Sequence, residues 1–271
     1  MGLTAKISLG VIAALFFLSL LSPYLVPYDP DAIDLDSIKQ PPTLKHLMGT
    51  DTKGRDILAR VLSGGKISIG ISVFAAVISM GIGLTVGLIS GYFRGVIDTA
   101  LMAFVDLILA FPSLILAIGI SVLMSPGMYT VVIAIAAVSW ASFARLIRGH
   151  VLSIREMPYI EAARAIGCSN LRIVLLHVLP QCISLALVMA GMKLGGYILT
   201  EAALGFLGLG VQPPTATWGS MISSSRAYLS AAPWMVLPPG ILIAVTALCF
   251  NLMGDSLRDG FDAEKNKLRF Y

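Results

Sequence analysis

Long stretches without a charged residue constrain this chain more than any other feature of its sequence. Four such stretches contain 22, 27, 38 and 28 residues. They are residues 7–28, 67–93, 107–144 and 227–254. A helix needs only about 20 apolar residues to cross the hydrocarbon core of a bilayer. Since 57% of the chain is hydrophobic and only 13% is charged, the sequence predicts an all-α protein that crosses a membrane several times.

The residues that interrupt these stretches predict six transmembrane helices. Ser125, Pro126 and Gly127 divide the longest stretch in two, because Pro and Gly punctuate helices. The first stretch resembles a signal peptide, but it continues to Val26 without an A-x-A-like cleavage site, so we expect it to be retained. The predicted helices are residues 7–27, 67–92, 97–124, 129–149, 181–200 and 236–257.

The distribution of Lys and Arg predicts the orientation of these helices. If the N-terminus is cytoplasmic, 11 Lys and Arg residues, Arg269 the last of them, lie on the cytoplasmic side and seven on the other. This bias follows the positive-inside rule, so we expect both termini in the cytoplasm. Residues 1–66 then hold the first helix and an extracytoplasmic segment, and residues 67–271 form a core with five helices. The loop 150–180 is cytoplasmic and the loop 201–235 is extracytoplasmic.

The cytoplasmic loop contains its own helix signals. Pro158 suits a first helical turn, and Gly167 suits the left-handed position that ends a helix. Ser169 or Asn170 is expected to cap a second short helix, which Pro180 is expected to end. A helix of about nine residues is unstable alone in water, so the first of the two needs a surface to hold it.

The same loop contains Glu161-Ala162-Ala163, Gly167 and Leu179-Pro180. In these residues it resembles the EAA loop of the permease subunits of ATP-binding-cassette (ABC) importers. The general pattern of that loop prefers Ile at the position of His177, but the branch of the family that carries dipeptides, oligopeptides and nickel often has His there. Three further stretches resemble the same branch: Gly49-Thr50-Asp51 with Gly54-Arg55-Asp56; residues 204–210 followed by Pro213-Pro214 and Trp218-Gly219; and Gly254-Asp255 with Leu257-Arg258-Asp259.

This resemblance covers nearly the whole chain from about residue 28 and implies the fold of a type I ABC importer permease. It implies that the first loop helix is a coupling helix, which sits in a groove of a cytoplasmic ATPase. The coupling residues would be Glu161, Ala162, Ala163, Arg164, Gly167, Leu179 and Pro180. The implied partners are a second, similar permease chain, two ATPase subunits that hold ATP and Mg, and an extracytoplasmic substrate-binding protein. Pro213, Pro214 and Trp218 are expected to face the binding protein, and residues 218–229 to form a short amphipathic helix.

Several other sequence patterns do not match the binding or catalytic motifs that they superficially resemble. Gly64-Gly65-Lys66 lacks the earlier Gly and the following Ser or Thr of a phosphate-binding loop, so we expect no ATP site in this chain. Gly83, Gly87 and Gly91 recur every four residues, which favours close helix packing over a dinucleotide loop. No catalytic or metal-ligating motif is evident, the three cysteines are expected to be free thiols, and the net charge of +4 reflects topology rather than nucleic acid binding.

Two ionisable residues, Asp106 and Lys193, fall inside predicted spans, where a lone charge is costly. They are expected to form an ion pair or to line a polar path. In the alternative interpretation Lys193 extends its ammonium group toward the interface and Asp106 bonds to backbone or hydroxyl groups.

The resemblance therefore implies a permease subunit in a bacterial inner membrane that forms half of a translocation path for dipeptides or oligopeptides. The same machine carrying nickel, a glutathione-like compound or another small chelate is the first alternative. A secondary transporter, which would need inverted repeats and broken helices at corresponding places, is a second. A structural subunit of another membrane complex is a third.

Overall fold

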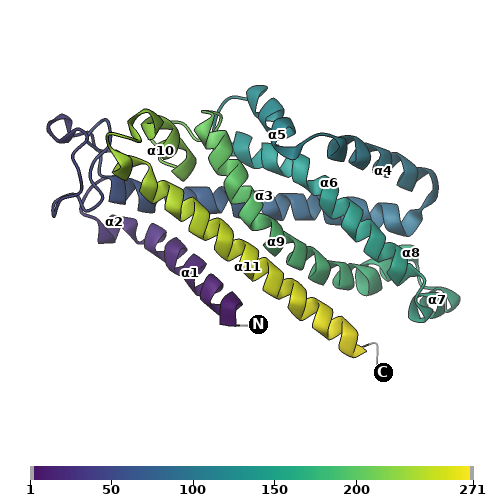
Figure 1. Ribbon diagram of the computed structural model, residues 1–271. Helices are drawn as coiled ribbons and strands as arrows, with labels where there is room; N and C mark the ends of the chain where they lie inside the picture. The colour runs from purple at the N-terminus through teal and green to yellow at the C-terminus, as the bar shows by residue number, and fades with distance from the viewer. Residues whose placement is uncertain (1–2, 269–271) are drawn as a thin grey trace.

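The computed structural model describes the backbone of residues 3–268 and the side chains of residues 3–260, and the regular elements in that part of the chain are helices (Figure 1). The predicted all-α fold is confirmed. The helices are α1 (Leu3–Leu20), α2 (Ser22–Leu25), α3 (Ile57–Phe93), α4 (Gly95–Ala110), α5 (Ser113–Val122), α6 (Met128–Arg155), α7 (Pro158–Ala165), α8 (Asn170–Ile173), α9 (Leu179–Phe206), α10 (Trp218–Ser225) and α11 (Leu237–Leu268). Short 3-10 turns lie at Leu35–Ser37, Arg226–Tyr228 and Pro233–Met235, and a π-helical turn lies at Val174–Val178.

Five helices in the described residues are long and apolar enough to cross a membrane unaided. They are α1, α3, α6, the continuous helix Asn170–Phe206 that contains α8 and α9, and α11. The third predicted span, residues 97–124, is a bent pair, since α4 and α5 meet at an angle of 92°. Pro112 lies at the bend, where its ring and missing N–H prevent a straight helix from continuing. The prediction of one straight helix over residues 97–124 is therefore wrong, while the multi-pass architecture is confirmed.

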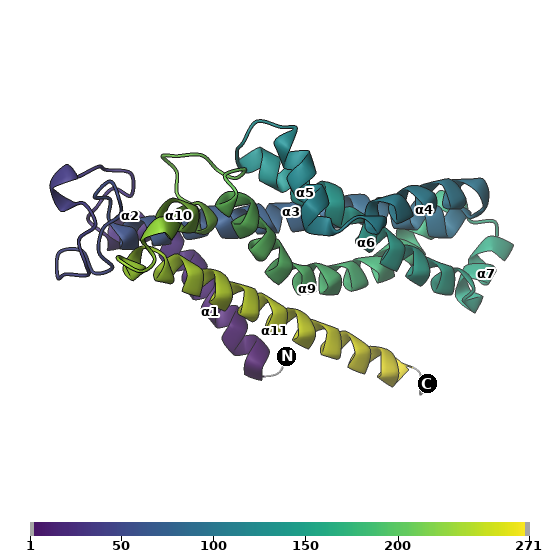
Figure 2. The same ribbon diagram turned by 45° about the horizontal axis from the view of Figure 1, so that its top comes forward.

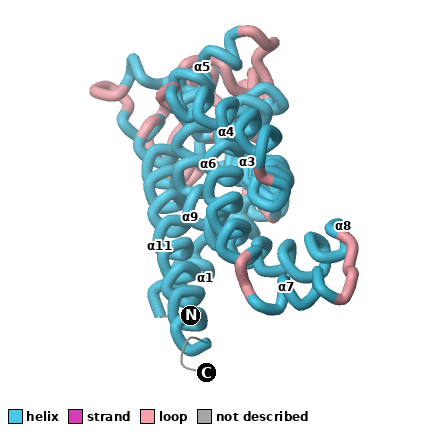
Figure 3. The backbone as a smooth tube through the Cα atoms, turned by 90° about the vertical axis from the view of Figure 1, so that its right-hand side faces the viewer, coloured by secondary structure: helices cyan, strands magenta, loops and turns pink. Residues whose placement is uncertain are grey.

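The loops that were assigned to opposite sides of the membrane lie at opposite ends of the bundle. In Figure 1 the segment between α2 and α3 lies beside α10 at one end, and α7 lies at the other. Figure 3 shows α7 and α8 projecting from the bundle. The predicted short helix after residue 217 is confirmed as α10 and the 3-10 turn that follows it. Arg269, which entered the orientation count, lies outside the described residues.

The closest packing joins α3 to α6 and uses the predicted glycine ridge. Cβ atoms added at Gly83, Gly87 and Gly91 would lie 2.3, 2.7 and 2.8 Å from atoms of α6. Gly191 and Gly195 of α9 form a second ridge, where added Cβ atoms would lie 3.0 and 2.3 Å from side-chain atoms of α11. Small residues let the backbones approach and so increase van der Waals contact where lipid provides no hydrophobic driving force.

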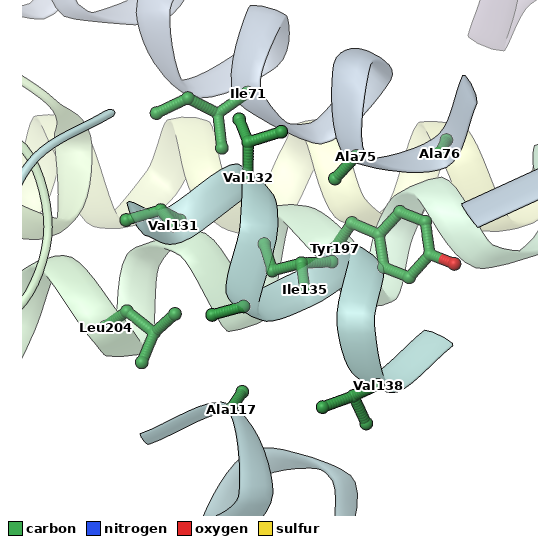
Figure 4. Close-up of a cluster of buried hydrophobic side chains, with 11 residues drawn as sticks. Ile71, Ala75, Ala76, Ala117, Val131, Val132, Ile135, Val138, Tyr197 and Leu204 are labelled. Atoms are coloured by element: carbon green, nitrogen blue, oxygen red, sulfur yellow. The ribbon is translucent and has the colours of Figure 1, made fainter. Parts of the chain in front are cut away.

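A cluster of buried apolar side chains fills the space between α3, α6 and α9 (Figure 4). Ile71 comes from α3, Ile135 from α6 and Leu204 from α9, and each is almost completely buried. Ala117 of α5 belongs to the same cluster, so the second half of the bent pair is packed into the bundle. Figure 2 shows α1 and α11 diverging from these central helices toward the two termini.

The start of α3 differs from the prediction. It begins at Ile57 rather than at residue 67, because the Asp56 carboxylate caps it by accepting a hydrogen bond from the Ala59 N–H at 2.7 Å. Arg60 and Lys66 interrupt the uncharged stretch without interrupting the helix. The proposed boundary at residue 66 therefore falls within α3, and the division into residues 1–66 and 67–271 stays a prediction.

The effect of Pro180 was also predicted incorrectly. Ser169 caps α8 as expected, but the helix does not end at Pro180, which instead occupies the first turn of α9. The π-helical turn at Val174–Val178 precedes it. A π turn widens the helix locally, so that the proline ring and its missing N–H fit without ending the helix.

The glycine ridge gives a direct test of this packing. Gly87→Ala places a Cβ atom 2.7 Å from both the Ala144 carbonyl oxygen and the Ile147 Cβ atom, so α3 and α6 must separate. We expect a loss of about 1–3 kcal/mol in the free energy of unfolding, measured as a lower melting temperature of the purified chain in detergent. Gly81→Ala is the matched control, because nothing lies within 4 Å of its added Cβ. Equal melting temperatures for the two variants would contradict the packing.

Candidate functional site

The short helix α7 is closed by a glycine-dependent stop, as the sequence predicted. Gly167 has a φ angle of +84°, in the left-handed region. Its N–H donates to the Arg164 carbonyl at 3.0 Å, and the Cys168 N–H donates to the Ala163 carbonyl at 3.0 Å. This pair of bonds is the Schellman arrangement, which a residue with a Cβ atom adopts only with strain.

One face of α7 is anchored in the protein. Ile160 is 0% exposed and Ala163 is also buried, and both belong to a cluster with residues of α3, α6 and α9. Val151 and Ile154 of α6 and Val178 at the start of α9 lie in the same cluster. A helix this short is therefore held in place by apolar packing rather than by its own propensity.

The other face of α7 is exposed. Glu161, Ala162 and Arg164 are all exposed, and Ile166 just beyond the helix is 80% exposed. Leu171 on α8 is exposed as well, so charged and apolar groups share one surface at the tip of the loop. Of the two remaining predicted coupling residues, Leu179 is half-buried and Pro180 is exposed in the first turn of α9. Exposed apolar groups rimmed by charges are typical of a surface that meets another protein.

Tyr92, at the end of α3, holds this loop and was not identified from the sequence. Its hydroxyl donates to the Asn170 side-chain oxygen at 2.9 Å, and its carbonyl accepts from the Arg155 guanidinium at 2.6 Å. The Arg164 guanidinium lies 5.6 Å from the centre of its ring. An aromatic residue at the end of a long span was the only sequence signal, and it is too common to be specific.

A cavity of about 620 Å³ lies at membrane depth, with walls from α4, α5, α6, α9 and α11. Its apolar surface comes from residues such as Ile135 and Leu199. Its polar residues are Ser113, Ser139, Ser142, Lys193, Tyr197, Thr200 and Asn251. This size lies in the range of small-molecule sites, and a few polar groups on apolar walls are typical of them.

The expected pairing of Asp106 with Lys193 is wrong. The Asp106 carboxylate forms an ion pair with Arg145 of α6, while Lys193 lines the cavity and has no ion pair among the described residues. Because α4 ends at Ala110, Asp106 lies one turn from a helix end and not deep in a straight span. A second ion pair, from Asp98 to Arg148 at 2.6 Å, also joins α4 to α6.

Trp218 does not have the exposed position expected of a residue that faces a binding protein. It is 1% exposed, and its indole N–H donates to the Val61 carbonyl at 2.9 Å. The ring therefore fixes α10 to α3. Pro213 and Pro214 are exposed, and for them the assignment stays a prediction.

The signature after the first span builds a folded segment at the same end of the bundle. The Asp51 carboxylate accepts hydrogen bonds from the Arg55 backbone N–H at 3.0 Å and pairs with its guanidinium at 2.7 Å. Gly54 has a φ angle of +73°, and an added Cβ would lie 1.6 Å from the Asp34 carbonyl oxygen, so only glycine fits. Arg60 donates to the Pro30 carbonyl at 2.6 Å and thereby ties this segment to α3.

A family model described as "Binding-protein-dependent transport system inner membrane component" matches residues 83–266. A second, described as "N-terminal TM domain of oligopeptide transport permease C", matches residues 4–42.

Curated relatives and solved structures resemble the chain over most of its length. The glutathione transport system permease protein GsiD of Pectobacterium atrosepticum is 40% identical over 259 residues, which cover 93% of this chain and 86% of that protein. A putative peptide transport system permease protein of Brucella suis is 40% identical over 257 residues, which cover 95% and 86%. An inward-facing structure of the MetNI methionine ABC transporter matches with a TM-score of 0.59 at 20% identity and covers 75% of this chain and 97% of that chain. A crystal structure of an amino acid ABC transporter with histidines gives 0.55 at 20% identity, covering 76% and 94%. At this identity, the structures show a shared fold.

Single substitutions can test the buried face of α7 separately from its exposed surroundings. Ile160→Ala removes a fully buried side chain, at a cost of about 2–5 kcal/mol for such a truncation, so α7 should detach from the bundle. We expect faster tryptic cleavage after Arg164 in the purified chain in detergent. Ile166→Ala is the control, because that side chain is exposed. Unchanged cleavage of the Ile160→Ala variant would show that Ile160 does not anchor α7.

Proposed function

Because this chain belongs to the family of binding-protein-dependent transport system inner membrane components and is the permease of an ABC importer, we propose that it forms half of a translocation path for small peptides. We propose further that α7 links this path to an ATPase on a separate chain. One observation carries the proposal. The short helix α7 is buried on one face, is exposed on the other, and joins two helices that line the membrane cavity.

The connections of α7 to those helices are short. Two residues separate α7 from the end of α6, and four residues separate it from α8, which continues into α9. Both α6 and α9 line the cavity, through residues such as Ser139 and Thr200. A displacement of α7 is therefore passed to the cavity walls without a long flexible linker to absorb it.

Polar contacts stiffen the base of this loop. The Arg94 guanidinium forms an ion pair with Glu156 at 2.6 Å, and Arg155 and Arg164 both contact Tyr92. The ion pair is exposed and contributes little stability by itself. Its importance is geometric, since it joins the end of α3 to the link between α6 and α7.

These contacts support the following mechanism. Glu161, Ala162 and Arg164 face a groove of a cytoplasmic ATPase, which holds ATP and Mg and closes when ATP binds. Closure moves α7, and with it the inner ends of α6 and α9, so that the cavity opens to the outside instead of the inside. A nucleotide drives this change only because it binds the closed ATPase arrangement better than the open one.

The surroundings of the chain follow from the same proposal. A second, similar permease chain completes the path, and a substrate-binding protein docks on the end that carries Pro213 and Pro214. The chain lies in a bacterial inner membrane with both termini in the cytoplasm, as the Lys and Arg bias indicates.

Small peptides are the substrate class that the relatives favour. One is named for glutathione transport and another for peptide transport. The cavity offers hydroxyl, amide and ammonium groups, which match the polar groups of a peptide. An uptake measurement decides whether the importer also carries nickel or another small chelate.

Gly167 provides the test of coupling. Gly167→Val forces a β-branched residue into the left-handed region, at a cost of at least about 1–2 kcal/mol, and misaligns the exposed face of α7. In the complete importer reconstituted into vesicles, we expect the number of peptides taken up per ATP hydrolysed to fall about 10-fold. Gly167→Asn is the matched control, because Asn tolerates this conformation, and it should keep most of the wild-type ratio.

Two results would contradict the proposal. Normal coupling in the Gly167→Val variant would show that α7 does not transmit ATPase closure. Uptake that persists without ATP and stops when ion gradients are collapsed would identify a secondary transporter instead.

A further inference from the structure

Lys193 is an unusual residue in the wall of the membrane cavity. It lies in the middle of α9 and lines the cavity together with residues of four other helices. A cation at membrane depth is costly and is retained mainly where it serves a function or has a partner. The positive charge of Lys193 therefore needs either a partner or a function.

Lys193 has no ion pair among the residues that the structure describes. Asp106, the acidic residue expected to neutralise it, is paired with Arg145. Glu201, on the same helix, is 1% exposed and has Ser68 and Thr217 beside its carboxyl group. The residues that line the cavity in the described part of the chain include none that is acidic. The cavity thus presents one positive charge that its own wall does not neutralise.

The remaining polar groups of the cavity complement this charge. The hydroxyls of Ser142 and Thr200 donate to backbone carbonyls, at 2.9 Å in both cases, and their oxygens can still accept hydrogen bonds. A peptide offers N–H groups to such oxygens, while its C-terminal carboxylate suits an ammonium group. Lysine binds carboxylates as a point charge and does not demand one orientation, which fits a site that a substrate only passes through.

We propose that Lys193 binds the carboxylate of the substrate inside the membrane and so makes the permease itself, and not only the binding protein, selective for substrates that carry a free carboxylate. This inference rests on the proposed transport of peptides through the cavity. It assigns to Lys193 a substrate-binding role, and it predicts that cationic substrates without a carboxylate pass poorly.

A second cavity adjoins the first. It has a volume of about 700 Å³ and shares Met192 with the first. Arg145, which pairs with Asp106, lines it together with His150 and Arg258.

The test compares trialanine with its C-terminal amide in the complete importer, reconstituted with its partner subunits and binding protein. Lys193→Met should lower the uptake of trialanine by about 10-fold or more at low concentration, because a hydrogen bond to a charged group is lost. Uptake of the amide should change less than 3-fold, and Lys193→Arg should restore most of the uptake of trialanine. The binding protein is the same in every reaction, so the ratio of variant to wild type for each substrate isolates the permease.

The controls separate the possible causes of a loss. Lys66→Met removes an exposed lysine that does not line the cavity and should leave both uptake rates unchanged. ATPase activity stimulated by the binding protein should persist in Lys193→Met, because replacing a cation at membrane depth by an apolar residue does not destabilise the chain. An equal loss for both substrates, or no loss for either, would overturn the role of Lys193. If the wild-type importer takes up neither substrate with ATP present, the proposed function fails instead, and this inference fails with it.

Discussion

The close approach of α3 and α6 is the interaction on which the rest of the structure depends. Three glycines, spread over two turns of α3, let the two backbones meet. The paired helices then form a rigid spine. Tyr92 at one end of that spine holds α7, and another part of α6 forms a wall of the cavity. A single packed pair thus connects a surface that can meet a motor with a cavity that can hold a substrate.

Features that depend on local chemistry were predictable from the sequence. The uncharged stretches predicted the spans, the spacing of Gly83, Gly87 and Gly91 predicted their packing face, and Gly167 predicted the end of α7. The predictions that failed concern features that depend on the three-dimensional surroundings of a residue. Pro180 is accommodated by a widened turn, and Asp106 finds Arg145 because α4 bends away at Pro112. Sequence spacing revealed neither the widened turn before Pro180 nor the pairing of Asp106 with Arg145.

The end of the bundle that carries α10 shows the same distinction between a recognisable pattern and its physical role. The signature after the first span was recognised as a resemblance, but its physical role came only from the structure, in which Gly54 and Asp51 fold that segment tightly against α3. Trp218 was expected to meet a partner and instead fixes α10 to α3. Residues with a strong family signature at this end therefore build the scaffold, while a contact of the exposed Pro213 and Pro214 with another protein stays a prediction.

The central claim is that α7 presents its exposed face to an ATPase, and cross-linking tests it most directly. The measurement places a cysteine at Ala162, which is exposed, in a chain that lacks its native cysteines, and joins it to cysteines in the groove of the ATPase in intact membranes. The account predicts a cross-link whose yield changes when ATP is added, while a cysteine at the buried Ala163 gives little. A cysteine at 162 that reacts only with reagents added outside the cell, and never captures the ATPase, would contradict it.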